Sequence, residues 1–127
     1  YLQDIYNIEE NIIIGGDFNI APFDIDVYSP IKMQNTLSFT EIEKQKFRSI
    51  LNSGFHDTFR ALRPNAQKFS WWDYRNKSLN NNTGLRIDMI LASVNLMNQL
   101  YYVDLYKQYR YHEKPSDHIP VFASFYI

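Results

Sequence analysis

Residues 84–93 read GLRIDMILAS, a stretch in which polar and apolar side chains alternate. The alternation predicts a strand over residues 85–92. Its two expected faces carry Arg86, Asp88 and Ile90 on one side, and Ile87, Met89 and Leu91 on the other. A carboxylate at Asp88, in mid-strand, is costly to bury unless a donor or a metal ion compensates it. Two interpretations stay open: a structural salt bridge with Arg86, or a role for Asp88 in holding a histidine tautomer or a metal.

Upstream, a second strand is predicted over residues 11–16, where a short isoleucine run ends at two glycines. The motif GGDFN (15–19) follows, with Asp17 and Asn19 two positions apart, so both side chains can point the same way at a strand end. A carboxylate beside a carboxamide can activate a water and bind a phosphate oxygen. The alternative is that the two residues only build a turn.

Downstream, the segment KPSDHIPVFASF (114–125) places Asp117 and His118 just before an alternating strand. This pair offers a metal carboxylate and an imidazole. The alternative is a polar turn with an exposed histidine. The other histidines, His56 and His112, have no such setting and are expected to be incidental.

The rest of the chain mixes helix and strand signals around these three motifs. A helix is predicted over residues 40–52, because its start carries two overlapping capping boxes and Gly54 supplies a stop. Further expected elements are a helix at the start of the chain, strands at 55–59, 69–74, 101–105 and 119–127, a short helix at 95–100, and loops at 21–30 and 75–84. Such a mixture predicts α/β layers.

The composition limits the classes of protein that the chain can represent. With 127 residues, 45% hydrophobic and 21% charged, it predicts one soluble globular domain, 1–127, and excludes a disordered chain. No apolar run approaches the roughly 20 residues of a membrane span, and no secretory signal pattern opens the chain. The absence of Cys excludes a disulfide scaffold, a Cys zinc site and a Cys nucleophile, and it favours a cytoplasmic location. Ser-His-Asp hydrolysis of the G-x-S-x-G type is also excluded.

Charge is unevenly distributed along the chain. Residues 1–31 contain six acids and no Lys or Arg, whereas residues 60–86 contain six basic residues and one acid. An acidic part beside a basic segment fits a metal site next to a polyanionic substrate. Ordinary surface variation is the alternative.

Together and in order, four segments resemble the exonuclease III branch of the endonuclease/exonuclease/phosphatase superfamily: GGDFN, FSWWDYRN (69–76), GLRIDMILAS and KPSDHIPVF. Members of this branch are bacterial DNA-repair enzymes that cleave at abasic sites and degrade duplex DNA from the 3′ end. GDFN and SDH are shared across the superfamily, which includes DNase I-like nucleases and lipid or inositol phosphatases. HDTFRALRP (56–64), FSWWDYR and GLRIDMIL are more specific to the branch.

The resemblance implies a role for each matching polar residue. Asp17 is similar to the family's water-activating carboxylate, and Asn19 to its phosphate-oxygen and water-orienting partner. His118 resembles the imidazole that contacts the scissile phosphate, and Asp88 the carboxylate that orients it. Asp117 resembles the metal-associated carboxylate, which implies Mg²⁺ as cofactor, with Mn²⁺ as an alternative ion.

The resemblance also implies a substrate pocket. Trp71, Leu85 and Ile87 match positions that form the family's apolar slot for an extruded abasic sugar, and a sugar without its base fits where a normal nucleotide does not. Arg86, in the same stretch, is included among the residues expected to bind substrate. Trp72 is expected to pack in the core.

The matching residues cover only the C-terminal half of the family's domain. The implied fold is α/β, the C-terminal half of a four-layer α-β-β-α sandwich (DNase I-like), with one mixed, mostly antiparallel sheet and flanking helices. The family's N-terminal half, which carries a Glu metal ligand, an Asn and an active-site Tyr, has no matching segment here. A half-domain of this kind would expose the inner face of its sheet, which predicts self-association when it stands alone.

Three functions stay open. The first is a Mg-dependent nuclease of the exonuclease III type, acting on double-stranded DNA with abasic sites or 3′ ends. The second keeps the fold but acts on a small or lipid phosphoester; the aromatic FSWWDYR segment and the basic residues 60–86 argue against it. The third is a non-catalytic, self-associating half-domain.

Overall fold

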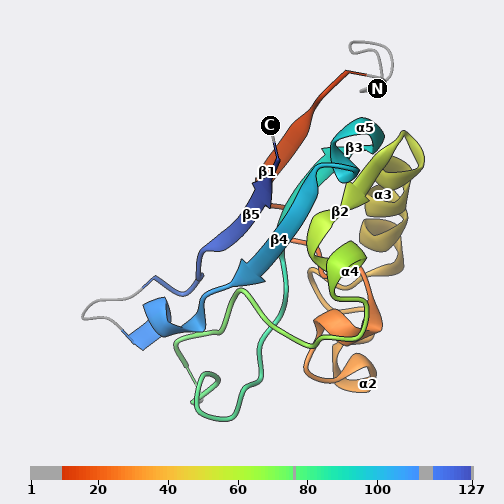
Figure 1. Ribbon diagram of the computed structural model, residues 1–127. Helices are drawn as coiled ribbons and strands as arrows, with labels where there is room; N and C mark the ends of the chain where they lie inside the picture. Colours follow the sequence, from red (N-terminus) through yellow and green to blue (C-terminus); the bar gives the residue numbers. More distant parts are fainter. Residues whose placement is uncertain (1–9, 76, 112–115, 127) are drawn as a thin grey trace.

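The computed structural model describes residues 10–75, 77–111 and 116–126. Its strands and helices alternate along the chain (Figure 1). They are β1 (Ile13–Asp17), η1 (Asp24–Asp26), α2 (Pro30–Met33), α3 (Glu41–Asn52), β2 (Phe55–Asp57), α4 (Thr58–Leu62), β3 (Asp88–Ser93), α5 (Val94–Met97), β4 (Leu100–Leu105), η2 (Lys107–Tyr111) and β5 (Val121–Phe125). The helix expected at the start of the chain lies outside the described residues.

The strand predicted from GLRIDMILAS lies at the centre of a three-stranded sheet. β3 pairs antiparallel with β1 on one side and with β2 on the other. Regular pairing begins at Asp88, three residues later than predicted, because Leu85 makes only isolated bridges, to Val27 and to Trp71. The register sets Asp17, the last residue of β1, opposite Asp88, the first residue of β3. Two carboxylates from distant parts of the sequence are thereby brought together.

The pairing is antiparallel throughout the described chain, but it forms two sheets where one was expected. β4 and β5 form a separate two-stranded ladder. The residues between the two sheets belong to the segment 69–74, which was predicted to be a strand. Among the described residues, its only bridges are at Trp71, to Leu85 on one side and to His118 on the other, and the neighbours Ser70 and Trp72 add backbone hydrogen bonds to the same two segments. It therefore links the two sheets instead of adding a full strand to either.

The predicted strand at residues 55–59 was wrong in its second half. β2 ends at Asp57, and α4 begins at the next residue. The Asp57 side chain accepts a hydrogen bond from the backbone N–H of Arg60, and this cap starts a helix where alternation alone suggested a strand. The predicted helix at 40–52 is confirmed as α3, with Thr40 and Glu43 forming a capping box.

Apolar side chains on one face of the three-stranded sheet form a core with α3. Phe47 of α3 is fully buried against Phe55 of β2 and against Met89 and Leu91 of β3. A second cluster, built around Trp72 and Phe59, packs beneath β4 and β5. The expectation that Trp72 belongs to the core is confirmed, since it is 1% exposed.

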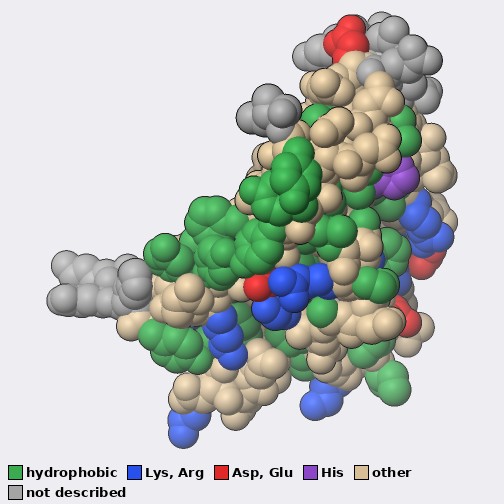
Figure 2. All heavy atoms as spheres, in the orientation of Figure 1, with side chains coloured by type: hydrophobic (Ala, Val, Ile, Leu, Met, Phe, Trp, Pro, Cys, Tyr) green, Lys and Arg blue, Asp and Glu red, His purple; other side chains and the backbone are tan. Residues whose placement is uncertain are grey.

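Hydrophobic side chains also gather on the surface over β4 and β5 (Figure 2). Tyr101 and Tyr126 are both more than half exposed, and their rings lie 4.3 Å apart. Phe122 is exposed as well and packs on Tyr106. Whether this surface mediates self-association stays a prediction. Within the described part of the chain, no helix combines the length and apolar character needed to span a bilayer.

Candidate active site

The candidate site forms where the start of β3 meets the loop that leads into β5. Asp88 and His118, thirty residues apart in sequence, are joined by a hydrogen bond of 2.8 Å between Nδ1 of the imidazole and Oδ2 of the carboxylate. The predicted contact between these two side chains is therefore confirmed. An ionised carboxylate can only accept, so Nδ1 carries the proton and Nε2 is left to face the rest of the site.

Asp17 lies on the Nε2 side of the histidine ring. Its Oδ2 is 3.6 Å from His118 Nε2, while its Oδ1 accepts a hydrogen bond of 2.9 Å from the backbone N–H of Asn19. The second contact closes a tight turn, in which Asn19 takes a positive φ of 54°. The turn interpretation and the catalytic one are thus compatible, since each uses a different oxygen of Asp17.

The surroundings of the Asp88–His118 pair raise the pKa of both side chains. Burial raises the pKa of the Asp88 carboxyl, against hydrogen bonds from His118 and Ser70 that lower it. Burial also tends to lower the pKa of His118. The hydrogen bond with Asp88 and the charges of Asp88, Asp17 and Asp117 outweigh that effect, so the pKa of His118 lies above its ordinary value.

Asp117 approaches the site from the residue beside His118. Its Oδ2 accepts a hydrogen bond of 3.0 Å from Nε1 of Trp71, and its Oδ1 lies 3.9 Å from His118 Nε2. Ligand atoms of Asp17, Asp88 and His118 all lie within 4.8 Å of one another. The carboxylate oxygens of Asp17 and Asp117 are donors that suit a hard divalent cation such as the Mg²⁺ that the resemblance implies. The imidazole of His118 is a nitrogen donor, which suits Mg²⁺ less, and its Nδ1 is already bonded to Asp88.

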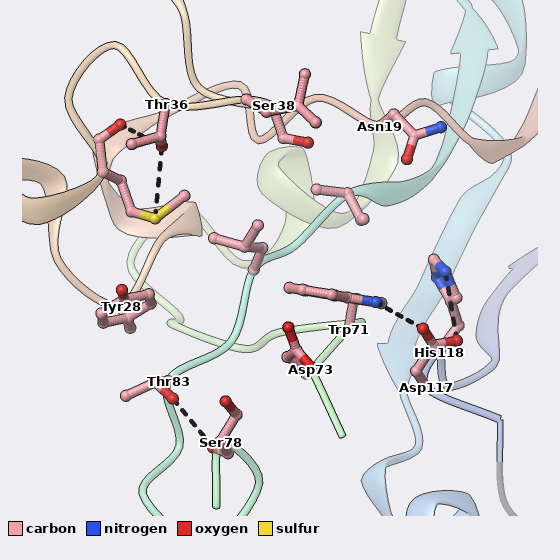
Figure 3. Close-up of a pocket in the computed structure, with 14 residues that line it drawn as sticks. Asn19, Tyr28, Thr36, Ser38, Trp71, Asp73, Ser78, Thr83, Asp117 and His118 are labelled. Carbon is pink, nitrogen blue, oxygen red and sulfur yellow. Dashed lines mark hydrogen bonds and ion pairs between the residues drawn. The ribbon is translucent and has the colours of Figure 1, made fainter. Parts of the chain in front are cut away.

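A pocket of about 630 Å³ opens beside these polar groups (Figure 3). Trp71, Leu85 and Ile87, the three residues expected to line an apolar slot, all line it, together with Asn19 and His118. Leu85 and Ile87 are almost fully buried, whereas Trp71 is partly exposed and is fixed through its hydrogen bond to Asp117. A volume of this size is in the usual range for a small-molecule site.

Sequence reasoning missed the opposite wall of the pocket. It comes from the segment around α2 and contributes Tyr28, Met33, Thr36, Leu37 and Ser38. The Ser29–Pro30 step, a helix N-cap followed by proline, was the available signal that an ordered element begins inside the predicted loop. The sequence pattern does not indicate that this segment lines the same pocket as Trp71.

The expected substrate-binding role of Arg86 is contradicted by the structure. The side chain is fully buried, and its guanidinium is hydrogen-bonded to Asp26 and Asp57. The structure gives no ion pair between Arg86 and Asp88, both of which it describes, so the alternative of a salt bridge between these two residues does not hold. Alternation alone could not assign Arg86, because its partners come from η1 and from the end of β2.

The basic segment 60–86 is less available to a polyanion than its composition suggested. Five of its six cations form ion pairs with carboxylates of the chain: Arg60, Arg63, Lys68, Arg75 and Arg86. Much of the positive charge of this segment is therefore paired with carboxylates of the chain.

Comparisons with known proteins identify the family of the chain. The family model described as "Endonuclease/Exonuclease/phosphatase family" matches residues 1–118. The chain belongs to this family. Within it, the chain is 38% identical to exodeoxyribonuclease III of Haemophilus influenzae over 98% of its own length and 49% of that protein. The resemblance to the exonuclease III branch is thereby confirmed.

Solved structures of family members show the same fold. An AP endonuclease from Archaeoglobus fulgidus superimposes with a TM-score of 0.94 at 34% identity, covering 100% of this chain and 50% of the other. A 3′-5′ exonuclease from Neisseria meningitidis gives a TM-score of 0.93 at 36% identity, covering 98% of this chain and 49% of the other. The DNase I-like α/β fold class is confirmed, and the chain spans about half the length of these relatives, their C-terminal half.

Proposed function

We propose that this chain is the C-terminal half of a Mg²⁺-dependent DNA-repair nuclease of the exonuclease III type. Its substrates would be duplex DNA with abasic sites and duplex 3′ ends. The observation that carries the proposal is that His118, which forms an array with Asp17 and Asp88, also lines the pocket that contains Trp71. Relatives named exodeoxyribonuclease III and DNA-(apurinic or apyrimidinic site) endonuclease support the same reaction class.

The side chains of the array divide the work of phosphodiester hydrolysis. Oδ2 of Asp17, which is not used by the turn with Asn19, takes a proton from the attacking water. His118, whose raised pKa favours the imidazolium with a proton on both ring nitrogens, donates through Nε2 to an oxygen of the scissile phosphate, where negative charge develops. Asp88 holds the ring through Nδ1, so that Nε2 keeps its direction during the reaction.

Asp117 is the residue that we assign to the metal, together with the Glu that the family carries in its N-terminal half. A bound Mg²⁺ would neutralise charge on the phosphate and fix its orientation. The hydrogen bond from Trp71 occupies one oxygen of Asp117 and leaves Oδ1 directed toward the array. Trp71 would therefore couple the apolar pocket to the metal-binding carboxylate.

The pocket supplies the preference for an abasic site. An extruded sugar without a base presents apolar ring atoms and no base to accommodate, which fits a slot formed by Trp71, Leu85 and Ile87. The unstacking cost of extrusion is lowest where the base is already missing. The reaction would thus be directed to abasic sites by shape more than by charge.

The proposal is tested with the complete protein, meaning these residues together with an N-terminal half of the kind that the relatives carry. Cleavage of a duplex with one abasic site is compared with cleavage of bis(p-nitrophenyl) phosphate, a small soluble phosphodiester, in Mg²⁺ and in EDTA. Asp117→Asn should reduce Mg²⁺-dependent cleavage of the abasic duplex. Asp24→Asn, at an exposed carboxylate outside the site, is the matched control. Turnover of the small diester without cleavage of the abasic duplex would favour the phosphodiesterase alternative instead.

A further inference from the structure

Ser70 is a fully buried residue that connects the two sides of the candidate site. Its backbone N–H donates to the carbonyl of Leu85 at 2.9 Å, and its own carbonyl accepts from the N–H of Ile119 at 2.8 Å. Leu85 lies three residues before Asp88, the first residue of β3, and Ile119 directly follows His118. Ser70 therefore helps to set the spacing between the carboxylate and the imidazole.

The hydroxyl of Ser70 has an unusually constrained set of partners. Its oxygen accepts hydrogen bonds from the backbone N–H of Ile87 at 2.9 Å and from that of Asp88 at 3.0 Å. A serine hydroxyl has two lone pairs and one proton, so both acceptor positions are occupied. The proton must then be donated to a neighbouring acceptor, because leaving a buried donor unpaired is costly.

That acceptor is the backbone carbonyl of Leu85, at 3.5 Å, which is longer than the roughly 2.7–2.8 Å preferred by an O–H···O bond. The two shorter contacts, from the N–H groups of Ile87 and Asp88, fix the backbone at the start of β3 against the Ser70 hydroxyl. The hydrogen bond from Ile119 to the Ser70 carbonyl fixes the residue next to His118 in the same way.

We propose that Ser70 is a positioning residue: its hydroxyl holds the backbone N–H of Asp88 and its carbonyl holds that of Ile119, so that the Asp88 carboxylate and the His118 imidazole stay within hydrogen-bond distance. The inference rests on the proposed function, since it assigns Ser70 an effect on the same reaction. The Asp88 carboxylate then keeps its place against Nδ1–H of the imidazole. Nε2 of the same ring stays directed toward Asp17 at 3.6 Å.

The chain offers a matched control at Ser93, at the other end of β3. This serine is also fully buried, and its hydroxyl accepts from the N–H of Ile12 at 3.0 Å and donates to the carbonyl of Glu10 at 2.8 Å. Ser93→Ala thus removes a buried hydroxyl with the same number of close hydrogen bonds, away from the candidate site. If the Ser70 hydroxyl has only a structural role, Ser70→Ala and Ser93→Ala should change melting temperature and kcat in the same way.

The experiment compares Ser70→Ala, Ser70→Thr and Ser93→Ala in the complete protein. Melting temperature is recorded with kcat and KM on an abasic duplex. Ser70→Ala should lower kcat by about 10- to 100-fold with little change in KM, the usual loss when a partner that orients a functional histidine is removed. Ser70→Thr retains the hydroxyl and should restore most of kcat, while Ser93→Ala should lower the melting temperature and leave kcat unchanged. Equal kcat for Ser70→Ala and Ser93→Ala would overturn the proposal.

A double variant shows whether Ser70 acts through Asp88. Adding Ser70→Ala to Asp88→Asn should reduce kcat no further than Asp88→Asn alone, because the group that Ser70 positions has already been changed. If the double variant instead lowers kcat by the product of the two separate effects, Ser70 does not act through Asp88. Should Ser70→Ala fail to fold, Ser70→Cys takes its place, since a thiol keeps the shape and is a weak donor.

An NMR measurement separates this inference from the proposed function. The ¹⁵N shifts of the His118 ring, recorded at a pH above its pKa, where the ring is neutral, report which nitrogen carries the proton, and they require no catalysis. Ser70→Ala should mix the two tautomers, and Ser93→Ala should not. If abasic DNA is not cleaved but the tautomer still depends on Ser70, the proposed function fails and the positioning role stands. An unchanged tautomer in Ser70→Ala would refute the positioning role by itself.

Discussion

Replacing Arg86 by Met should destabilise the protein strongly, although Arg86 lies outside the candidate array. Its guanidinium is completely buried, with Nε 2.7 Å from Asp26 Oδ1 and Nη1 3.1 Å from Asp57 Oδ1. Asp26 is itself fully buried, and Asp57 is 6% exposed. Removing one partner from a buried ion pair leaves an uncompensated charge and typically costs about 3–5 kcal/mol. Because two carboxylates lose their shared cation and, within the described part of the chain, only Asp26 keeps a second one, Arg60, we expect the upper part of that range.

The assay is urea denaturation followed by tryptophan fluorescence, performed on the complete protein. Arg75→Met is the matched control, since Arg75 makes an ion pair of 2.8 Å with Asp73 but is 82% exposed, and its loss should leave the unfolding midpoint nearly unchanged. Combining Arg86→Met with Asp26→Asn and Asp57→Asn should recover part of the lost stability, because the uncompensated charges are then removed as well. An Arg86→Met protein with normal unfolding free energy and weakened DNA binding would refute this reasoning and restore the substrate-binding role suggested by the sequence.

Four further predictions concern the site. Asp17→Asn in the complete protein should lower kcat by about 100-fold, the usual contribution of a general base, with little change in DNA affinity measured by fluorescence anisotropy; near-normal cleavage would leave Asp17 only its turn with Asn19. Trp71→Ala should weaken abasic-site cleavage by about 1–3 kcal/mol with a nearly unchanged melting temperature, whereas Trp72→Ala should cost about 3–5 kcal/mol of stability; the opposite pattern would exchange their roles. The pKa of His118 is raised in the folded state. Protonated His118 therefore adds to the free energy of unfolding below the unfolded-state pKa of about 6.5, and this contribution is lost as pH rises through the higher folded-state pKa. The difference in melting temperature between wild type and His118→Asn should therefore shrink as pH rises above about 6.5, and a difference that grows would contradict the sign of the shift. The 127-residue chain alone should show little Mg²⁺-dependent cleavage, since the proposed metal site lacks the carboxylate of the other half; robust cleavage would show that this half is sufficient.

Local features were well predicted where a short pattern has one dominant physical cause. The helix α3 follows from its capping box and apolar stripe, both of which are contained within a few consecutive residues. The strands β1 and β4 follow from short apolar runs near glycine or polar turns. Predictions failed at Asp57 and over residues 69–74, because a side-chain cap and a single bridging residue override local strand preference.

The sequence alone named Asp17, Asn19, Asp88, Asp117 and His118, because their motifs match a family and because polar groups at strand ends suggest chemistry. It also led to the expectation that Asp88 and His118 meet. Only the tertiary structure decided that Arg86 belongs to Asp26 and Asp57, that Ser70 lies between the two sides of the site, and that residues 28–38 close the pocket opposite Trp71. The physical reason is that a buried polar group must find a partner wherever the fold provides one. That partner is set by strand register and by packing between distant segments, which alternation within one strand does not encode.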